Sequence, residues 1–380
     1  MIKIGILTFH FSENYGAVFQ AYALRKYLLE SGYDVEFVNY QPAYLEEGEK
    51  IQFSDFFSKV IFKKIFLKLV GLKQKYFGNV SVKEGFEDFR VKLLGVGGST
   101  YKTKSELESS LVKFDVLICG SDQVWKPSDQ VGIDPVYYLQ FATESCPVKI
   151  SYAPSFGTAD LPNQYREQVK SLLTDFRFIS VREKSGCEIV RRLVEKEVVQ
   201  VPDPTFLLND YSSIYKPYTA AEALNGKYVF CYCLRSRELI GEVANALAES
   251  DNLAIFSPDN PHRRWKEIGT TVHICPRQWL WLLANSACVV TNSFHGVALS
   301  IILRKKFIAV GLQGSKKSFN ERVKNLLREL GLENRFVDKF DMDNIQNLAH
   351  SDDDLVAAQL RIEEFSSKGK TYLSESLGAL

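Results

Sequence analysis

The chain alternates short runs of β-branched and aromatic residues with longer segments in which apolar residues recur at helical spacing. Residues 2–9, "IKIGILTF", have the pattern of a buried strand. Residues 14–32 repeat apolar side chains at helical spacing, and residues 33–40, "YDVEFVNY", resume a strand pattern. This order predicts a βαβ unit. Its first loop, His10 to Tyr15, follows the carboxyl end of a strand, where open α/β sheets bind their ligands.

The same alternation continues through the rest of the sequence. The further predicted strands are "FDVLIC", "VKISY", "FRFISVRE", "VVQV", "KYVFCYC", "NLAIFS", "TVHIC", "ACVVT" and "KFIAVG". Strands that alternate with helices predict parallel sheets covered on both faces. A polar interval at 209–226 breaks the pattern. We therefore predict an α/β fold of two Rossmann-like domains facing a cleft, 1–220 and 221–380, the second ending in a helical tail.

Composition narrows the function classes. A chain of 380 residues is too long for one compact core, which agrees with two domains. The net charge of +1 gives no overall field that would gather nucleic acid, so an anionic ligand must be held by local cations and helix termini. No apolar run reaches the roughly 18 residues of a membrane span, and the first residues read as a strand rather than a signal peptide. Seven cysteines without a CxxC pair indicate reduced thiols, a cytoplasmic location and no zinc site.

Residues 52–77 form a basic, aromatic-rich stretch inside a variable insertion at about 45–110. One interpretation is an amphipathic helix packed on its own domain. The alternative is a peripheral membrane contact, because lysines beside phenylalanine and leucine are typical of interfacial helices. The second interpretation would place the protein at the inner membrane face.

Three candidate residues of the second half follow predicted strands. Arg235 follows "YVFCYCL", Arg277 follows "VHICP" and His295 follows "ACVVTNSF". The carboxyl ends of parallel strands share one edge of a sheet, so we expect two guanidiniums and an imidazole to converge there. Cations beside a helix N-terminus predict a phosphate or carboxylate ligand. Alternatively, each arginine is a surface or salt-bridged residue.

His295 also has two interpretations. It could be a structural histidine bonded to a neighbouring loop. Gly296 favours a site, because glycine at a strand-to-helix turn lets the backbone approach a ligand closely. A helix N-terminus disfavours the imidazolium whereas a bound phosphate favours it, so arrival of an anionic substrate could protonate the ring and make it a general acid.

The first half has candidates of the same kind. Asp122 in "GSDQVW" is either a helix N-cap or Asx-turn residue, or a carboxylate that accepts a proton from a hydroxyl. Arg182 and Glu183 are either strand-end ligands for an anion or an ion pair that fixes the loop. Asp203 stands between two prolines, which favours a turn.

Missing motifs exclude several enzyme classes. The sequence has no GxxxxGK[ST], no clean GxGxxG, no GxSxG and no HExxH. These absences argue against P-loop, classical dinucleotide-binding, serine-hydrolase and zincin chemistry.

Seven segments, in this order, resemble the polysaccharide pyruvyl transferase family. They are "FSENYGAVFQAYAL", "ICGSDQVW", "SYAPSFG", "VRE", "DPTFLL", "VTNSFHGVALSIIL" and "RVKNLLRELGLENR". The resemblance covers residues 2 to about 336 and implies a GT-B-like fold. It also implies transfer of the enolpyruvyl group of phosphoenolpyruvate onto a sugar diol as a cyclic ketal. The acceptor would be a sugar or a lipid-linked oligosaccharide, and no cofactor or metal is expected.

The resemblance places the donor on the second domain and the family's donor-side histidine at His295. Some members of the family have an arginine at the position of Ser293. In this chain Arg235, Arg277 or Arg322 could supply that positive charge instead. Gly296 completes the expected donor set. We expect His295 to be the acid and Asp122 the base, each worth roughly 10²–10⁴-fold in rate. The acceptor-side candidates are His10, Asn14, Tyr15, Gly16, Ser121 and Arg182.

Two other functions fit the same architecture. One is a glycosyltransferase that uses a nucleotide sugar, although no clear ribose-binding acid follows the helix after Gly296. The other is a catalytically silent sugar-binding or scaffold protein. The presence of His295, Arg235 and Arg277 argues mildly against this function.

Overall fold

The computed structural model describes residues 1–46, 79–110, 112–128, 130–143, 145, 147–234, 238–259, 268–314 and 320–380. The basic stretch 52–77 and Arg235 therefore lie outside the described residues. The chain divides into two compact units. Unit 1 comprises Met1–Lys83, Glu87–Pro204 and Thr371–Leu380, and unit 2 comprises Glu84–Phe86 and Thr205–Lys370. The chain passes from unit 1 to unit 2 after Pro204, just before the polar interval 209–226 in which the sequence predicts a domain boundary.

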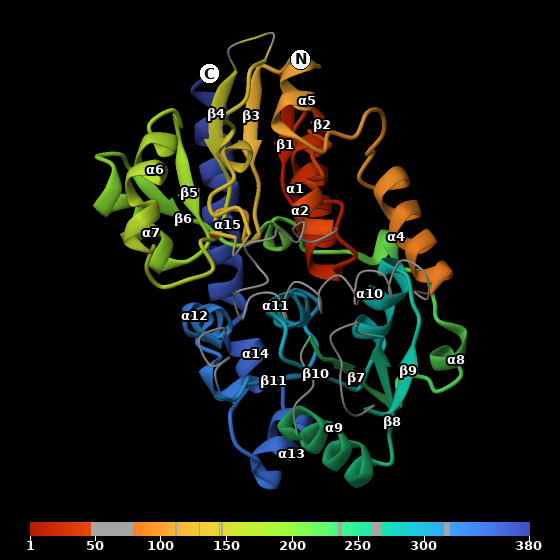
Figure 1. The fold of residues 1–380 in the computed structure, drawn as a ribbon. Helices are drawn as coiled ribbons and strands as arrows, with labels where there is room; N and C mark the ends of the chain where they lie inside the picture. The colour runs from red at the N-terminus through yellow and green to blue at the C-terminus, as the bar shows by residue number, and fades with distance from the viewer. Residues whose placement is uncertain are drawn as a thin grey trace, which may run out of the picture. The chain divides into compact units, whose positions relative to one another are not determined.

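Unit 1 is built on a parallel sheet. Its strands are β1 (Lys3–Leu7), β2 (Asp34–Phe37), β3 (Val116–Cys119) and β4 (Val148–Ser151), in the order β2-β1-β3-β4 (Figure 1). The parallel pair β5 (Ile179–Val181) and β6 (Val198–Gln200) joins β4 through a bridge between Ile150 and Phe178. The strand order reverses between β1 and β3, which makes their carboxyl ends the switch point where such sheets bind ligands.

The helices of unit 1 connect these strands. They are α1 (Tyr15–Glu30), α2 (Ala43–Glu46), α4 (Val80–Lys92), α5 (Lys104–Ser109), α6 (Asn163–Leu173) and α7 (Lys184–Leu193). Asn14 caps α1 because its Oδ1 accepts the N–H groups of Gly16 and Ala17 at 2.9 and 3.3 Å. The helix stops before Gly32, which has φ +88 and allows the chain to turn back toward β2.

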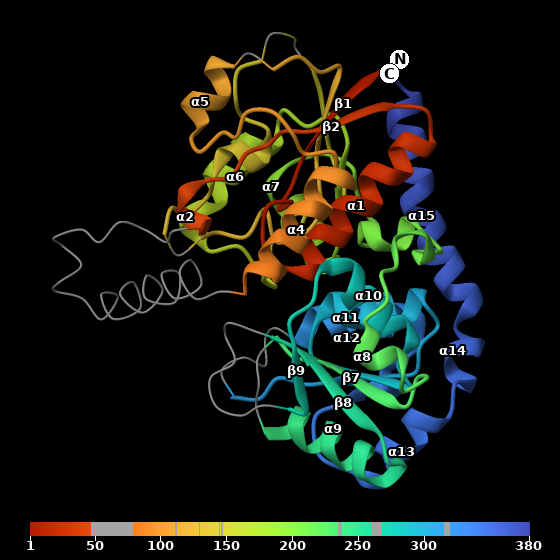
Figure 2. The same cartoon turned by 90° about the vertical axis from the view of Figure 1, so that its right-hand side faces the viewer.

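Unit 2 contains a second parallel sheet. Its strands are β7 (Tyr228–Tyr232), β8 (Ala254–Pro258), β9 (Thr270–Val272), β10 (Cys288–Thr291), β11 (Phe307–Val310) and β12 (Phe336–Val337). Their order is β12-β11-β10-β7-β8-β9, and Figure 2 shows β7, β8 and β9 side by side. This is the Rossmann strand order, with the switch point between β7 and β10. The predicted α/β class with two Rossmann-like units is confirmed, and the cleft stays a prediction.

Helices of unit 2 pack against both faces of its sheet, and the last of the helices below continues into unit 1. They are α8 (Thr219–Glu222), α9 (Glu238–Asp251), α10 (Pro276–Asn285), α11 (Phe294–Ile302), α12 (Asn320–Leu330), α13 (Met342–His350), α14 (Asp353–Ala357) and α15 (Gln359–Gly378). Successive side chains of β7 alternate between the faces. Val229 and Cys231 join the apolar cluster of α9, whereas Phe230 and Tyr232 pack edge-on against Trp279 of α10 at 5.5 and 4.9 Å. Because β7 is buried on both faces, its sequence is a continuous apolar run and does not alternate with polar residues.

Among the described residues, none of the helices is both long enough and apolar enough to cross a bilayer.

Candidate functional site

At the switch point of unit 2, side chains at and just after the end of β10 form hydrogen bonds to the neighbouring strand end and loop. Thr291 Oγ1 donates to the carbonyl of Tyr232, the last residue of β7, at 2.7 Å. Asn292 Oδ1 accepts the N–H of Leu234 at 2.9 Å. These two bonds hold the loops after β7 and β10 together at the carboxyl edge of the sheet.

Ser293 caps the helix that begins at this edge. Its Oγ accepts the N–H of Gly296 at 3.3 Å, and its own N–H donates to Thr291 Oγ1 at 3.1 Å. The cap supplies a partner for one of the first N–H groups of α11. The helix dipole makes this end favourable for an anion.

His295 lies in the first turn of α11 and is buried. Its ring meets that of Phe294 edge-on, with centroids 5.2 Å apart and planes at 89°. The imidazole is therefore fixed at the helix start beside Ser293, as the strand-to-helix pattern of the sequence predicts.

Gly296 is required for the packing of α11. A Cβ at this position would lie 2.5 Å from Thr291 Oγ1 and 3.1 Å from Thr291 Cβ. Its N–H is also already bonded to Ser293. The glycine thus allows α11 to pack directly against the end of β10. Its role as a point of close backbone approach to a ligand stays a prediction.

Arg277, one of the two arginines expected at this edge, has other surroundings. Arg277 is half-buried near the start of α10, where its Nε donates to the carbonyl of Ile214 at 2.9 Å. Its Nη2 lies 3.5 Å from the carbonyl of Tyr215, so its guanidinium fixes the loop around residue 214. Arg322 lies in the first turn of α12 and is half-buried. Strand β9, which precedes Arg277, is separated from β10 by β8 and β7.

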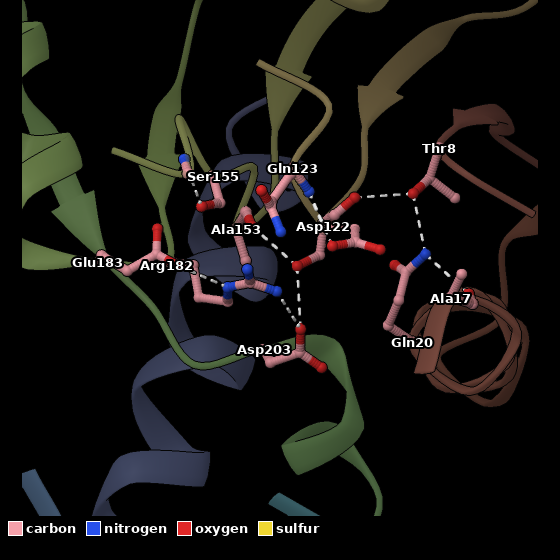
Figure 3. Close-up of polar contacts among 12 residues, drawn as sticks. Thr8, Ala17, Gln20, Asp122, Gln123, Ala153, Ser155, Arg182, Glu183 and Asp203 are labelled. Atoms are coloured by element: carbon pink, nitrogen blue, oxygen red, sulfur yellow. Dashed lines mark hydrogen bonds and ion pairs between the residues drawn. The ribbon is translucent and has the colours of Figure 1, made fainter. Parts of the chain in front are cut away.

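A buried polar network crosses the carboxyl edge of the sheet in unit 1 (Figure 3). Gln20 of α1 donates through Nε2 to Thr8 Oγ1 and to the carbonyl of Ala17, both at 2.9 Å. Thr8 Oγ1 in turn donates to the carbonyl of Ser121 at 2.8 Å. This chain of bonds joins α1 to the strand ends of β1 and β3. Gln20 Oε1 is buried and has no hydrogen-bond partner among the described residues.

The network continues from Ser121 to a buried ion cluster. Ser121 Oγ lies 2.8 Å from the carbonyl of Ala153 and 3.1 Å from Asp203 Oδ2. Arg182 donates through Nη1 to Asp203 at 3.0 Å and through Nε to Glu183 at 2.8 Å. Arg182 therefore forms the ion pair that was one of its two interpretations. The turn interpretation of Asp203 is corrected, because its carboxylate is a buried ion partner.

Charges in this cluster stabilise the guanidinium. Burial by itself would lower the pKa of Arg182, but the carboxylates of Glu183, Asp203 and Asp122 together raise it above its ordinary value. Asp122 thus lies close enough for its charge to act on the buried arginine.

Asp122 has an unusual backbone. Its φ of +73 is in the left-handed region, which is rare for a residue with a side chain. Its carbonyl accepts the N–H of Ser155 at 2.8 Å, and its Oδ1 accepts the N–H of Gln123 at 2.8 Å. No helix begins in the described residues 123–128, so the N-cap interpretation is wrong. The carboxylate is half-exposed at the switch point.

The acceptor-side candidates of the first loop differ in accessibility. His10 is fully buried, with Nδ1 3.0 Å from the carbonyl of Thr8 and Nε2 3.0 Å from Asn39 Oδ1. Burial lowers its pKa despite these bonds, which join the first loop to Asn39 beyond β2. Asn14 is exposed as the cap of α1, and Tyr15 and Gly16 are buried in the first turn.

Three residues of these two sites were not identified from the sequence as site residues. Asn292 stands in the polar segment between Thr291 and Gly296, so its position after a strand was an available signal. Asp203 also follows a strand, and only its flanking prolines favoured a turn. Gln20 lies in the middle of a helical pattern and gave no signal, because its partner Thr8 belongs to another element.

Two parallel α/β units, each with polar side chains at its switch point, define a Rossmann-like protein with strand-end sites. The chain belongs to the polysaccharide pyruvyl transferase family, whose model matches residues 14–314. Among curated proteins, none has detectable sequence similarity to this chain.

Solved structures with related folds share little sequence with the chain. It is 10% identical to UDP-GlcNAc 2-epimerase from Methanocaldococcus jannaschii, over 92% of each chain, with a TM-score of 0.45. It is 10% identical to the enzyme of the same name from Neisseria meningitidis bound to UDP-GlcNAc, over 100% of each chain, with a TM-score of 0.46. With TcCGT1 in complex with UDP it shares 11% identity over 99% of this chain and 98% of that chain, with a TM-score of 0.49.

Proposed function

We propose that the protein transfers the enolpyruvyl group of phosphoenolpyruvate onto two hydroxyls of a sugar, forming a cyclic pyruvate ketal and releasing phosphate. The acceptor is a cell-surface polysaccharide or its precursor. Membership of the family supports the reaction class. The observation that carries the assignment of residues is the position of His295 in the first turn of α11, beside the switch point of unit 2.

The helix start suits the donor. Phosphoenolpyruvate carries a phosphate and a carboxylate, and the N-terminus of α11 offers a favourable dipole to one of them. Ser293 fixes this end of the helix, and Thr291 and Asn292 fix the loops around it. The other anionic group requires a cation, for which Arg322 and Arg235 are the candidates.

Ketal formation begins with a proton transfer to carbon. His295 as imidazolium donates its proton to the methylene carbon, which becomes a methyl group and leaves an oxocarbenium-like centre at C2. A sugar hydroxyl attacks C2 and its proton passes to Asp122, giving a phosphorylated intermediate. Phosphate then leaves with the electron pair of its C–O bond, and the second hydroxyl attacks C2 to close the ring and gives its proton to the released phosphate. The proton taken up by Asp122 is returned through solvent to His295. The sum is phosphoenolpyruvate plus diol giving ketal plus phosphate.

Asp122 suits the role of base because its carboxylate is half-exposed at a strand tip and accepts only a backbone N–H among the hydrogen bonds given above. A carboxylate must reach the hydroxyl proton directly or through one water, so an exposed oxygen is a requirement.

The experiment has a binding arm and a turnover arm. Phosphoenolpyruvate at ~100 times its dissociation constant should stabilise the protein by about 2.7 kcal/mol in a thermal-shift titration. His295→Ala should abolish phosphate release while the protein stays folded, and Asp122→Asn should lose turnover but keep the thermal shift.

Controls separate the competing functions. A thermal shift with UDP-sugars or GDP-sugars but not with phosphoenolpyruvate would indicate a glycosyltransferase on this fold. No shift with any of these ligands would favour the scaffold function. Wild-type turnover in His295→Ala would remove the proposed acid.

A further inference from the structure

Asp122 keeps a backbone conformation that is uncommon for residues with a side chain. A side chain at φ +73 costs free energy, so the conformation persists only when surrounding contacts determine it. The structure shows two such contacts on either side of the residue. The carbonyl of Asp122 accepts the N–H of Ser155, and the preceding side chain, Ser121, reaches Asp203 and the carbonyl of Ala153.

The group that anchors Ser121 is itself held rigidly. Asp203 is 1% exposed, and its Oδ2 meets both Ser121 Oγ and the guanidinium of Arg182. The backbone N–H of Arg182 also donates to the carbonyl of Pro154, the bridge partner of Asp122, at 3.2 Å. Arg182 therefore contacts both groups that surround Asp122. Its side chain binds Asp203, and its backbone N–H binds the carbonyl of Pro154.

Such an arrangement is costly to bury. Removing an arginine and two carboxylates from water carries a desolvation penalty that their attraction repays only with good geometry. A turn could be fixed by neutral groups at lower cost. We therefore expect the buried charges to have a function that neutral groups would not have. The half-exposed carboxylate of Asp122 lies beside them.

We propose that Ser121, Asp203 and Arg182 are positioning residues that hold Asp122 in its left-handed conformation and aim its carboxylate at the acceptor hydroxyl. This inference rests on the proposed function, in which Asp122 is the base. The three residues touch neither donor nor acceptor, and they act only through Asp122.

The first experiment compares two buried serines of the same sheet edge. Ser121→Ala removes the link to Asp203, whereas Ser151→Ala removes a buried bond of equal kind, from Ser151 Oγ to the carbonyl of Ser180 at 2.8 Å. We expect Ser121→Ala to lower kcat about tenfold with an unchanged KM for phosphoenolpyruvate, the size expected for one lost hydrogen bond. Ser151→Ala should keep the wild-type kcat. Equal kcat in both variants would overturn the proposal.

Asp203→Asn provides a second variant, which keeps the shape of the side chain but removes its charge. It should lower kcat at least as much as Ser121→Ala. If it does not fold, the comparison of the two serines decides.

The second experiment needs no turnover and so separates this inference from the proposed function. Glycine tolerates positive φ and alanine does not, so Asp122→Gly should unfold at a higher temperature than Asp122→Ala. In a Ser121→Ala background the backbone can relax, and the difference between the glycine and alanine variants should shrink by at least half. An unchanged difference would show that the network does not hold Asp122, whether or not phosphoenolpyruvate is the donor.

Discussion

At the scale of single residues, position along a strand was easier to predict than partners. Asp122, Arg182 and Asp203 all follow strands, and the local pattern identified Asp122 and Arg182 as strand-end residues, whereas the prolines beside Asp203 favoured a turn. Their pairing was not predictable, because Arg182 and Asp203 are 21 residues apart and meet only when β5 and β6 are adjacent. The same holds for the contact between Gly296 and Thr291, which depends on how closely α11 packs against the end of β10.

His10 makes stability depend on pH. Burial lowers the pKa of His10 in the folded protein below its ordinary value of 6.5. Between these two values the unfolded chain binds a proton that the folded protein excludes, so stability rises with pH. The contribution is present above pH 6.5 and is lost as the pH falls below it, by about 1.4 kcal/mol per pH unit.

Urea unfolding of the wild type and His10→Gln at about pH 7.5 and about pH 5.5 measures this effect. The wild type should lose more stability on acidification than the variant. His273→Gln, at an exposed histidine, serves as the control and should follow the wild type. If His10→Gln loses as much stability as the wild type, His10 is not the group responsible.

At the scale of elements, helices and strands followed from periodicity, but their order in the sheets did not. Strands such as β1, β3, β7 and β10 lie inside the apolar runs that predicted them. Strand order depends on which distant runs pair, and it decides which side chains meet. Arg277 illustrates this limit. It follows β9, which is an edge strand, and its guanidinium contacts the loop at Ile214 instead of the turn at His295.

Arg335 holds several elements of unit 2 together. This fully buried guanidinium donates to both oxygens of Asp354, at 2.6 and 2.7 Å. It also donates to the carbonyls of Phe307, Leu348 and Ser351. Strand β11, helix α13 and helix α14 therefore depend on one planar group. A lysine has three donors at a single point and cannot reproduce these contacts.

We expect Arg335→Lys to lower the free energy of unfolding by about 3 kcal/mol, because it removes the two-point contact with the half-buried carboxylate of Asp354 and leaves several carbonyls without their donor. Arg328→Lys is the matched control, since Arg328 is exposed and donates to the side chain of Asn325 on its own helix, and it should change stability by less than about 0.5 kcal/mol. Denaturant unfolding at constant pH gives both values. Equal stability of the two variants would show that the buried contacts of Arg335 contribute little.

At the scale of the whole molecule, the chain does not divide at a single point. Residues 371–380 belong to unit 1, although the residues before them belong to unit 2. A change in composition can indicate a boundary between neighbouring segments, as the polar interval at 209–226 does. It cannot reveal the return of a distant segment, because the pattern of α15 is that of any amphipathic helix.

The last ten residues should be necessary for the stability of unit 1. Tyr372, Leu373 and Leu377 are buried, and the hydroxyl of Tyr372 donates to the carbonyl of Ser151 at the end of β4, at 2.9 Å. Each buried side chain contributes roughly 1.5–3 kcal/mol, and a domain has only about 5–15 kcal/mol of net stability. Ending the chain after Lys370 should therefore expose β3 and β4 to hydrogen exchange while β7 and β10 stay protected. Ending it after Leu377 removes only exposed residues and should leave protection in both units unchanged. Full protection of β3 and β4 in the shorter chain would show that unit 1 is stable without its C-terminal segment.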